Sequence, residues 1–341
     1  MIHLDHKNSA NSRISHSYVN SIGQSLASST NVIRRRPARS ILGSFLFALY
    51  VYFFLYQGVT RSESRQEQPL QPQLDEIPSR IWQIFFGYTP LSDFAPALQT
   101  WISNNQDYSY TLMSDQGANE FARKHYADRP DILGPFLQLE FHVLRSDLLR
   151  YMILESEGGI YSDLDTVVQK SVRDWIPQEM RSKVHAVVGV EYDQLDGEPY
   201  YGMNERIQFC QWTMAASRGH PIMKKVVKKV VAALNETVER DNISIADFQP
   251  SDDEVIQVSG PVIWTHAVME AMSEATGTEM SYLNVTGMTE ARLFGDVLVL
   301  PIDGFGAGQP HSNSTRDENQ GAGDFYVRHQ WKGSWKHGWN G

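Results

Sequence analysis

Cysteine is almost absent from this chain, and positive charge is in deficit. Cys210 is the only cysteine among 341 residues, so no disulfide can form within the chain and no zinc site can be built from several thiolates. Acidic side chains number 40 against 30 Lys and Arg, and no basic stripe alternates with aromatic residues, which argues against an extended nucleic-acid-binding face. We therefore expect stability to come from core packing, for which an apolar fraction of 41% is ordinary.

Long uncharged apolar sequence occurs near the amino terminus. Residues 41–59 begin ILGSFLFALYVYFFLY and follow the basic cluster RRRPAR at 34–39. A membrane-spanning helix needs roughly 20 residues, and the preceding arginines favour a cytoplasmic amino terminus. A cleaved signal peptide is the alternative, although YQGVTRS is a poor cleavage site. The pattern predicts a single-pass type II protein with a cytoplasmic tail at 1–40, a transmembrane signal anchor at 41–59, a stem at 60–76 and a lumenal domain at 77–341.

Four N-glycosylation sequons lie beyond the predicted anchor. This modification occurs on surface loops of secreted or lumenal domains, so the sequons agree with the predicted topology. The acceptor residues would be Asn235, Asn242, Asn284 and Asn313.

Beyond Ile77, short apolar runs alternate with amphipathic segments. The runs at 80–86 and 108–114 indicate strands and the segment at 96–105 between them a helix, which is the order of a βαβ unit. The alternation predicts an α/β domain with a mainly parallel sheet flanked by helices, whose ligands bind at the carboxyl ends of the strands. Further strands are expected at 160–168, 184–193 and 296–302, and helices at 136–157 and 220–238.

The segment GGIYSDLDTVV, residues 158–168, interrupts an apolar, β-branched run with two aspartates. Side chains on a strand alternate between its faces, so Asp163 and Asp165 are expected to share one face while Leu164 points into the core. Two buried carboxylates without a cation would repel each other and lose hydration, at several kcal/mol per ion. A shared divalent cation would remove this cost; the alternative is a turn with solvated carboxylates.

The preceding helix carries a second polar pair. Asp147 and Arg150 are spaced i, i+3 and therefore lie on one helix face. The alternative interpretation is a surface ion pair, which contributes roughly a few tenths of a kcal/mol. The helix that carries this pair continues through apolar residues and leads directly to the acidic segment at 158–168.

The whole segment LRSDLLRYMILESEGGIYSDLDTVV resembles the central signature of glycosyltransferase family 32, the D-x-D sugar transferases. The resemblance is greatest to the fungal Golgi initiation-specific α-1,6-mannosyltransferase-like members. It extends over residues 77–336 and implies a GT-A fold. The other matching segments are IPSRIWQIFF, QFCQWTMAASRGHPIM, SGPVIWTHAV and HQWKGSWK.

The resemblance implies a donor site built on these motifs. Asp163 and Asp165 would hold Mn²⁺ or Mg²⁺ against the diphosphate of a nucleotide sugar, a role that suits hard cations and oxygen ligands. Asp147 and Arg150 match the donor-binding pair of the family, and Tyr161 matches a tyrosine that lines the same pocket.

The resemblance also places residues around this centre. Phe85 stands where related toxins carry a base-stacking tryptophan, and Trp82 is a competing candidate. His329 would complete the metal shell or touch the diphosphate, with a structural hydrogen-bonding role as the alternative. Ser334 and Trp335 would close a carboxyl-terminal flap over the donor.

The resulting hypothesis is a Golgi membrane enzyme with a lumenal catalytic domain. It would be a retaining, metal-dependent glycosyltransferase that moves a hexose, with mannose from GDP-mannose as the leading donor, onto an N-glycan outer chain or a glycolipid. Asp163, Asp165 and Arg150 would be catalytic, because negative charge develops on the departing nucleotide. Glu191 and Asp193 are candidates for the acceptor side, with a solvated loop as the alternative.

Other assignments stay open at this point. Another donor such as UDP-galactose, a metal-dependent hydrolase and a non-catalytic lumenal glycan-binding protein are compatible with parts of the pattern. A complex with other transferases is also left open, since these motifs do not specify the oligomeric state.

Overall fold

The computed structural model describes residues 74–86, 90–200, 203, 205–315 and 325–332. They belong to the second of two units into which the chain divides, Met1–Gln71 and Pro72–Gly341. The predicted cytoplasmic tail, the anchor at 41–59 and the stem up to residue 73 lie outside the described residues. Within the described ranges, no helix combines the length and the apolar character needed to cross a bilayer.

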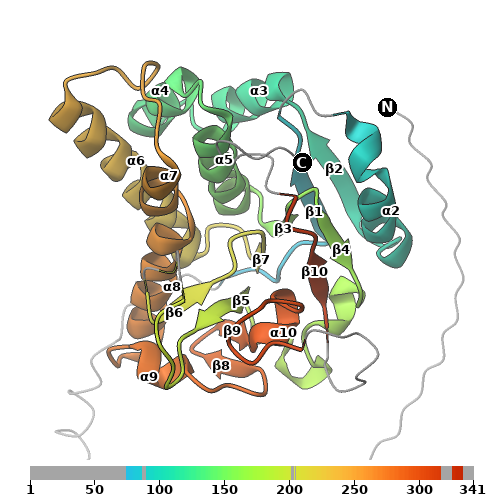
Figure 1. The fold of residues 1–341 in the computed structure, drawn as a ribbon. Helices are drawn as coiled ribbons and strands as arrows, with labels where there is room; N and C mark the ends of the chain where they lie inside the picture. The colour runs from blue at the N-terminus through green and yellow to red at the C-terminus, as the bar shows by residue number, and fades with distance from the viewer. Residues whose placement is uncertain (1–73, 87–89, 201–202, 204, 316–324, 333–341) are drawn as a thin grey trace, which may run out of the picture. The chain divides into compact units, whose positions relative to one another are not determined.

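A mixed β-sheet forms the centre of the described unit (Figure 1). Its strands lie in the order β2-β1-β3-β7-β5-β9-β8, and β6 pairs with β5 at the side of this path. Five strands (β2, β1, β3, β5 and β9) run in one direction, while β7 and β8 oppose them. The strands are β1 Arg80–Ile84, β2 Ser109–Met113, β3 Gly159–Ser162, β5 Ala186–Asp193, β6 Ile207–Phe209, β7 Thr213–Ala216, β8 Arg292–Phe294 and β9 Val297–Leu300.

These pairings confirm the α/β class and the predicted βαβ unit. Strands β1 and β2 are parallel and are joined by α2. The sheet is mainly parallel in strand direction, but the reversed strands β7 and β8 make it a mixed sheet. The helices are α2 Ala95–Asn104, α3 Asp115–His125, α4 Pro130–Gln138, α5 His142–Ser156, α6 Pro221–Asp241, α7 Asp252–Val258, α8 Pro261–Thr276, α9 Tyr282–Val285 and α10 Ile302–Phe305, with 3₁₀ turns at Leu91–Phe94, Val172–Asp174 and Gln178–Met180.

Alternate residues of the strands enter two separate cores. On β3, Tyr161 packs into a large core with helices α3 to α8, whereas Ile160 packs into a smaller core with α2, α10 and the tryptophans Trp101 and Trp175. Figure 1 shows α6, α7 and α8 on one side of the sheet and α2 on the other. Because strand side chains alternate between faces, odd-numbered positions at the end of β3 point toward α5.

One predicted helix is two helices in the structure. The segment expected to be helical at 136–157 breaks after α4, since Leu139 is extended and α5 begins only at His142. The predicted helix end at residue 157 is confirmed to within one residue, since α5 ends at Ser156. The Gly158 N–H donates to Leu154 O, and the φ of Gly158, +67°, is the left-handed conformation that ends a helix.

A two-stranded ribbon lies beside the sheet. Strand β4, Thr166–Val168, pairs antiparallel with β10, Val327–His329, so that His329 lies opposite Thr166. This pairing places the carboxyl-terminal segment next to residues 163–165, the turn between β3 and β4 that contains both aspartates and is called the acidic turn below.

The four predicted sequon asparagines lie among the described residues. Asn235, Asn242 and Asn313 are exposed, whereas Asn284 is half-buried. Its Oδ1 accepts hydrogen bonds from the N–H and Oγ of Ser281 at the start of α9. Glycosylation at these positions stays a prediction.

Gly159 provides a test of how β3 is placed in the sheet. Its φ is +106°, and a Cβ there would lie 2.6 Å from Arg80 O on β1. We predict that Gly159→Ala lowers the free energy of unfolding by about 2–4 kcal/mol, from backbone strain and the clash, as measured by urea unfolding of the full chain. Gly197→Ala is the matched control because its Cβ would meet only Gln194 O at 3.4 Å, and a change within about 0.5 kcal/mol is expected. Equal stabilities of the two variants would contradict this packing.

Candidate functional site

The two aspartates lie in a turn and not on the strand itself. Strand β3 ends at Ser162, and β4 begins at Thr166. The Thr166 N–H donates to Asp163 O at 3.3 Å and closes the turn, while the Asp163 N–H donates to Trp212 O at 2.8 Å. Leu164 is half-buried and does not occupy the core, so this part of the prediction is wrong. A tight turn interrupts the strand that was expected at 160–168, so β3 ends six residues earlier than the apolar pattern predicts, and β4 continues after the turn.

The turn nevertheless brings both carboxylates to one point together with a histidine. Ligand atoms of Asp163, Asp165 and His329 all lie within 4.8 Å of one another. Two carboxylates and an imidazole form a donor set that fits a divalent cation such as Mn²⁺ or Mg²⁺, since carboxylate oxygens suit hard cations and imidazole is a common ligand. These residues could hold the predicted metal.

Asp165 is held by the carboxyl-terminal segment. His329 Nε2 lies 3.1 Å from Asp165 Oδ1, and the Lys332 N–H donates to Oδ2 at 3.0 Å. Burial acts to raise the pKa of Asp165, but the contacts with His329 and Lys332 outweigh it and lower the pKa. Asp165 is therefore an ionised carboxylate at neutral pH.

Asp163 faces α5 and the large core. Its Oδ1 accepts a hydrogen bond from the Tyr161 hydroxyl, with 2.5 Å between the oxygens, and lies 3.4 Å from Arg150 Nη1. Burial raises the pKa of Asp163, and Asp165 adds to this rise, although Arg150 opposes it. The two carboxylates thus repel each other in a site with limited access to water, and a bound cation would relieve this repulsion.

The predicted pair on α5 is a buried ion pair and not a surface one. Arg150 Nη2 lies 2.9 Å from Asp147 Oδ1, and the two residues are only 6% and 3% exposed. The Ser259 hydroxyl donates to Asp147 Oδ2 at 2.6 Å, and Arg150 Nη1 donates to Gln211 O at 3.2 Å. Breaking such a pair costs about 3–5 kcal/mol because one charge is left buried without a partner.

The buried environment shifts the pKa values of both Asp147 and Arg150. Burial raises the pKa of Asp147 to about 6, against the opposing effects of Arg150 and Ser259. For Arg150, burial acts to lower the pKa, but Asp163, Tyr161 and Asp147 outweigh it and raise the pKa. The guanidinium also lies 4.8 Å from the Tyr161 ring centroid, a cation–π geometry. Arg150 is therefore a fixed positive charge beside the acidic turn.

One of the two candidates for base stacking is a core residue. Trp82 is 7% exposed, packs edge-on against Phe121 and donates its indole N–H to Gly158 O at 2.9 Å. Its ring is not available to a ligand, so the competing assignment to Trp82 is wrong. Phe85 is half-buried just after β1, and its stacking role stays a prediction. The predicted flap residues Ser334 and Trp335 lie outside the described residues.

The two acceptor-side candidates differ in their contacts. The Asp193 carboxylate accepts from Leu195 N–H, Thr286 Oγ1 and Gly287 N–H, so internal bonds between β5 and the segment after α9 account for its burial. Glu191 is buried and accepts from Gln208 Nε2 at 3.0 Å. An acceptor role for either residue stays a prediction.

Several supporting residues were not singled out from the sequence. Gln83 on β1 donates to Asp163 O at 2.9 Å, and its own side-chain oxygen accepts from the Tyr110 hydroxyl on β2. Side chains from two strands therefore hold the turn in place. Trp212 stacks on His329 with ring centroids 4.8 Å apart and planes 9° from parallel. Each lies in a segment that matches the family: Gln83 in IPSRIWQIFF, Trp212 in QFCQWTMAASRGHPIM and Lys332 in HQWKGSWK. The match marks the segments but does not indicate which side chains contact the turn.

Comparisons with known proteins agree with this site. The sequence model described as "Glycosyltransferase sugar-binding region containing DXD motif" matches residues 92–182, which contain the acidic turn, Asp147 and Arg150. An initiation-specific alpha-1,6-mannosyltransferase of Schizosaccharomyces pombe is 33% identical over 78% of this chain and 65% of its own length. The protein of the same name from Candida albicans is 29% identical over 82% of this chain and 78% of its own length.

A solved structure titled "PaToxG Glycosyltransferase" shares 17% identity, with a TM-score of 0.42 over 62% of this chain and 75% of that one. These sequence matches are all to sugar transferases or to their acidic sugar-binding motif. The matches relate this chain to the glycosyltransferases with the DXD sugar-binding region, glycosyltransferase family 32. The chain spans 65% of the length of the Schizosaccharomyces pombe relative.

The raised pKa of Asp147 predicts a pH-dependent effect on stability. Its folded-state value of about 6 exceeds the roughly 3.9 of an unfolded aspartate, so the folded chain binds more protons between these values and wild-type stability falls as pH rises through this window. Asn cannot titrate. The free energy of unfolding of Asp147→Asn, relative to wild type, should therefore rise by about 2–3 kcal/mol from pH 4 to pH 7.

This difference is measured by urea unfolding of both proteins in the presence of a chelator. Asp128→Asn, at an exposed position, is the matched control and should stay within about 0.5 kcal/mol of wild type. A pH-independent difference for Asp147→Asn would show that Asp147 is not buried as the structure has it.

Proposed function

We propose that this protein is a metal-dependent, retaining glycosyltransferase that moves mannose from GDP-mannose onto a glycan acceptor. The observation that carries the proposal is the convergence of Asp163, Asp165 and His329 within 4.8 Å, beside the buried guanidinium of Arg150. The match to the DXD family model and the similarity to proteins named as mannosyltransferases support the sugar and the reaction class. Retention of configuration is carried over from the family resemblance.

Charge explains how the described residues would act. Breaking a glycosyl phosphate bond places negative charge on the departing diphosphate and positive charge on the anomeric carbon. Asp163, Asp165 and His329 would hold the cation, which when bound supplies positive charge against the diphosphate. Arg150 offers a second, permanent positive charge from the opposite side of Asp163. Such preorganised charge is usually the largest contribution to rate acceleration.

Other residues would keep this arrangement rigid. Asp147 and the Gln211 carbonyl fix the guanidinium of Arg150, and the Tyr161 hydroxyl fixes Asp163. Trp212 packs flat against His329 and restricts rotation of its ring. Groups held in this way need little reorganisation when charge develops.

The proposal includes the place of the reaction in the cell. The apolar segment 41–59 behind a basic cluster and the four sequons beyond it support a Golgi membrane protein of type II topology with a lumenal catalytic domain. An N-glycan outer chain or a glycolipid would be the acceptor. The glycolipid alternative agrees with the name of one relative, "Inositol phosphoceramide mannosyltransferase 2".

A double variant tests the metal role. The full chain, purified in detergent, is incubated with Mn²⁺, GDP-mannose and a manno-oligosaccharide, and hexose transfer is followed by mass spectrometry. We predict that Asp163→Asn with Asp165→Asn lowers transfer at least about 100-fold, while Asp128→Asn stays within about twofold of wild type. Chelation with EDTA should abolish wild-type transfer.

The alternatives give different results in the same assay. Undiminished transfer by the double variant would refute the metal role. Transfer from UDP-galactose but not from GDP-mannose would correct the donor. Binding of oligosaccharide without Mn²⁺-dependent binding of any nucleoside diphosphate, measured by calorimetry, would favour a non-catalytic glycan-binding protein.

A further inference from the structure

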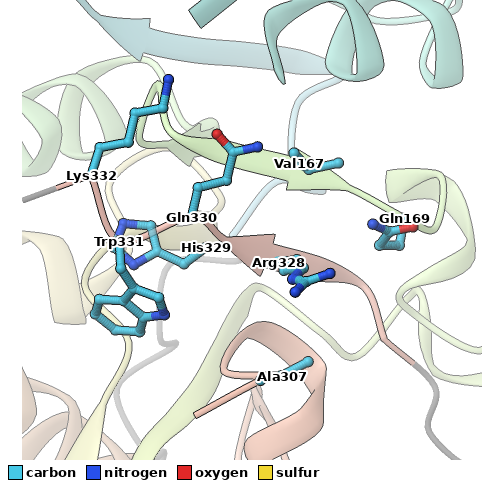
Figure 2. A pocket seen from close by; sticks show the side chains of 9 residues that line it. Val167, Gln169, Ala307, Arg328, His329, Gln330, Trp331 and Lys332 are labelled. Carbon is cyan, nitrogen blue, oxygen red and sulfur yellow. The ribbon is translucent and has the colours of Figure 1, made fainter. Parts of the chain in front are cut away.

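A cavity of about 500 Å³ lies between the β4–β10 ribbon and the segment that follows α10 (Figure 2). Its lining includes Gln169, Gly308, Arg328, His329 and Trp331. The volume falls within the roughly 300–1,000 Å³ typical of small-molecule sites. Figure 2 shows Trp331 and His329 together at one end of the cavity, with Arg328 and Gln169 toward the other.

The cavity lies on the opposite side of the acidic turn from the predicted donor groups. Asp163 faces Arg150 and Tyr161, whereas Asp165 faces His329 and Lys332. His329 belongs both to the candidate cation site and to the wall of the cavity. A second substrate in the cavity would therefore lie next to the cation without competing with groups on the Asp163 side.

Trp331 provides a fixed and accessible aromatic ring at this position. Its ring stands beside the stacked pair Trp212 and His329, with planes 74° and 67° from theirs and centroids 4.8 and 4.1 Å away. It is still 44% exposed. Its φ of +54° is uncommon for a residue other than glycine, and such conformations persist where the surroundings impose them, often at ligand sites.

We propose that this cavity is the acceptor-sugar subsite. It binds a neutral hexopyranose unit of the acceptor glycan, with Trp331 against the apolar face of the ring and Gln169 and Arg328 hydrogen-bonded to its hydroxyls. The inference rests on the proposed transferase function and goes beyond it, because it assigns the acceptor to the ribbon and not to the segment around Glu191 and Asp193.

The chemistry of a pyranose matches this lining. One face of the ring presents C–H groups, which carry partial positive charge and pack on the negative face of an indole. The rim carries hydroxyls that both donate and accept, as the Gln169 amide does, while the Arg328 guanidinium donates in a planar fork. Ligand sites of this kind combine an aromatic wall with a few polar groups that fix orientation.

Sugar binding can be measured without turnover. The full chain, purified in detergent, is titrated with an α-linked manno-oligosaccharide in the absence of donor and cation, and binding is followed by saturation-transfer NMR. We expect Trp331→Ala to weaken binding about tenfold, with partial recovery in Trp331→Phe. Gln169→Ala leaves the aromatic cluster intact and is expected to weaken binding about three- to tenfold. Leu283→Ala removes an exposed apolar side chain on α9 and is the matched control, expected to bind as wild type does.

The outcomes separate this inference from the proposed function. Wild-type affinity in both Trp331→Ala and Gln169→Ala would overturn the subsite, as would absence of oligosaccharide binding in the wild type. Mn²⁺-dependent binding of GDP, measured by calorimetry on the same samples, tests the transferase separately. If the protein binds oligosaccharide through Trp331 and Gln169 but binds no GDP, the sugar subsite is supported and the transferase function is contradicted.

Discussion

Repulsion between the carboxylates of Asp163 and Asp165 is the constraint on which the rest of the site depends. One short turn holds them together with a histidine nitrogen inside 4.8 Å, and Asp147 adds a third carboxylate nearby against the single guanidinium of Arg150. Charges with limited access to water must be paired or must bind a metal. A divalent cation held by Asp163, Asp165 and His329 would balance the remaining negative charge of the carboxylates.

The scaffold supplies what this arrangement needs from distant parts of the chain. Strand β1 fixes the turn through Gln83, α5 places Arg150 behind it, and the ribbon partner β10 brings His329 from 164 residues away. Each contributor is anchored in one of the two cores that flank the sheet. Rigidity matters because charge stabilises a transition state best when the charged groups do not have to move. In the proposed transferase, the same ribbon would place Trp331 on the far side of the candidate cation site, where the acceptor would approach.

Local sequence patterns revealed much of the fold and the acidic centre of the site. The apolar runs located β1, β2, β5 and β9, and the glycines correctly ended α5, because period and helix stops are local properties. The pairing of β4 with β10 could not be predicted in this way, since strands far apart in sequence carry no local mark of their partner. The burial of Trp82 was missed for the same reason: its partners Phe121 and Gly158 come from other elements. Asp147 and Arg150 were identified by spacing, but their burial depends on Ser259 and Gln211, which belong to segments more than 60 residues later.

A crystal structure with Mn²⁺ and GDP, using the anomalous signal of manganese to locate the ion, tests the central claim most directly. We predict one ion bound by carboxylate oxygens of Asp163 and Asp165 and by an imidazole nitrogen of His329, with the diphosphate on the side of Arg150. An ion located elsewhere, with the two aspartates turned apart toward bulk water, would contradict it.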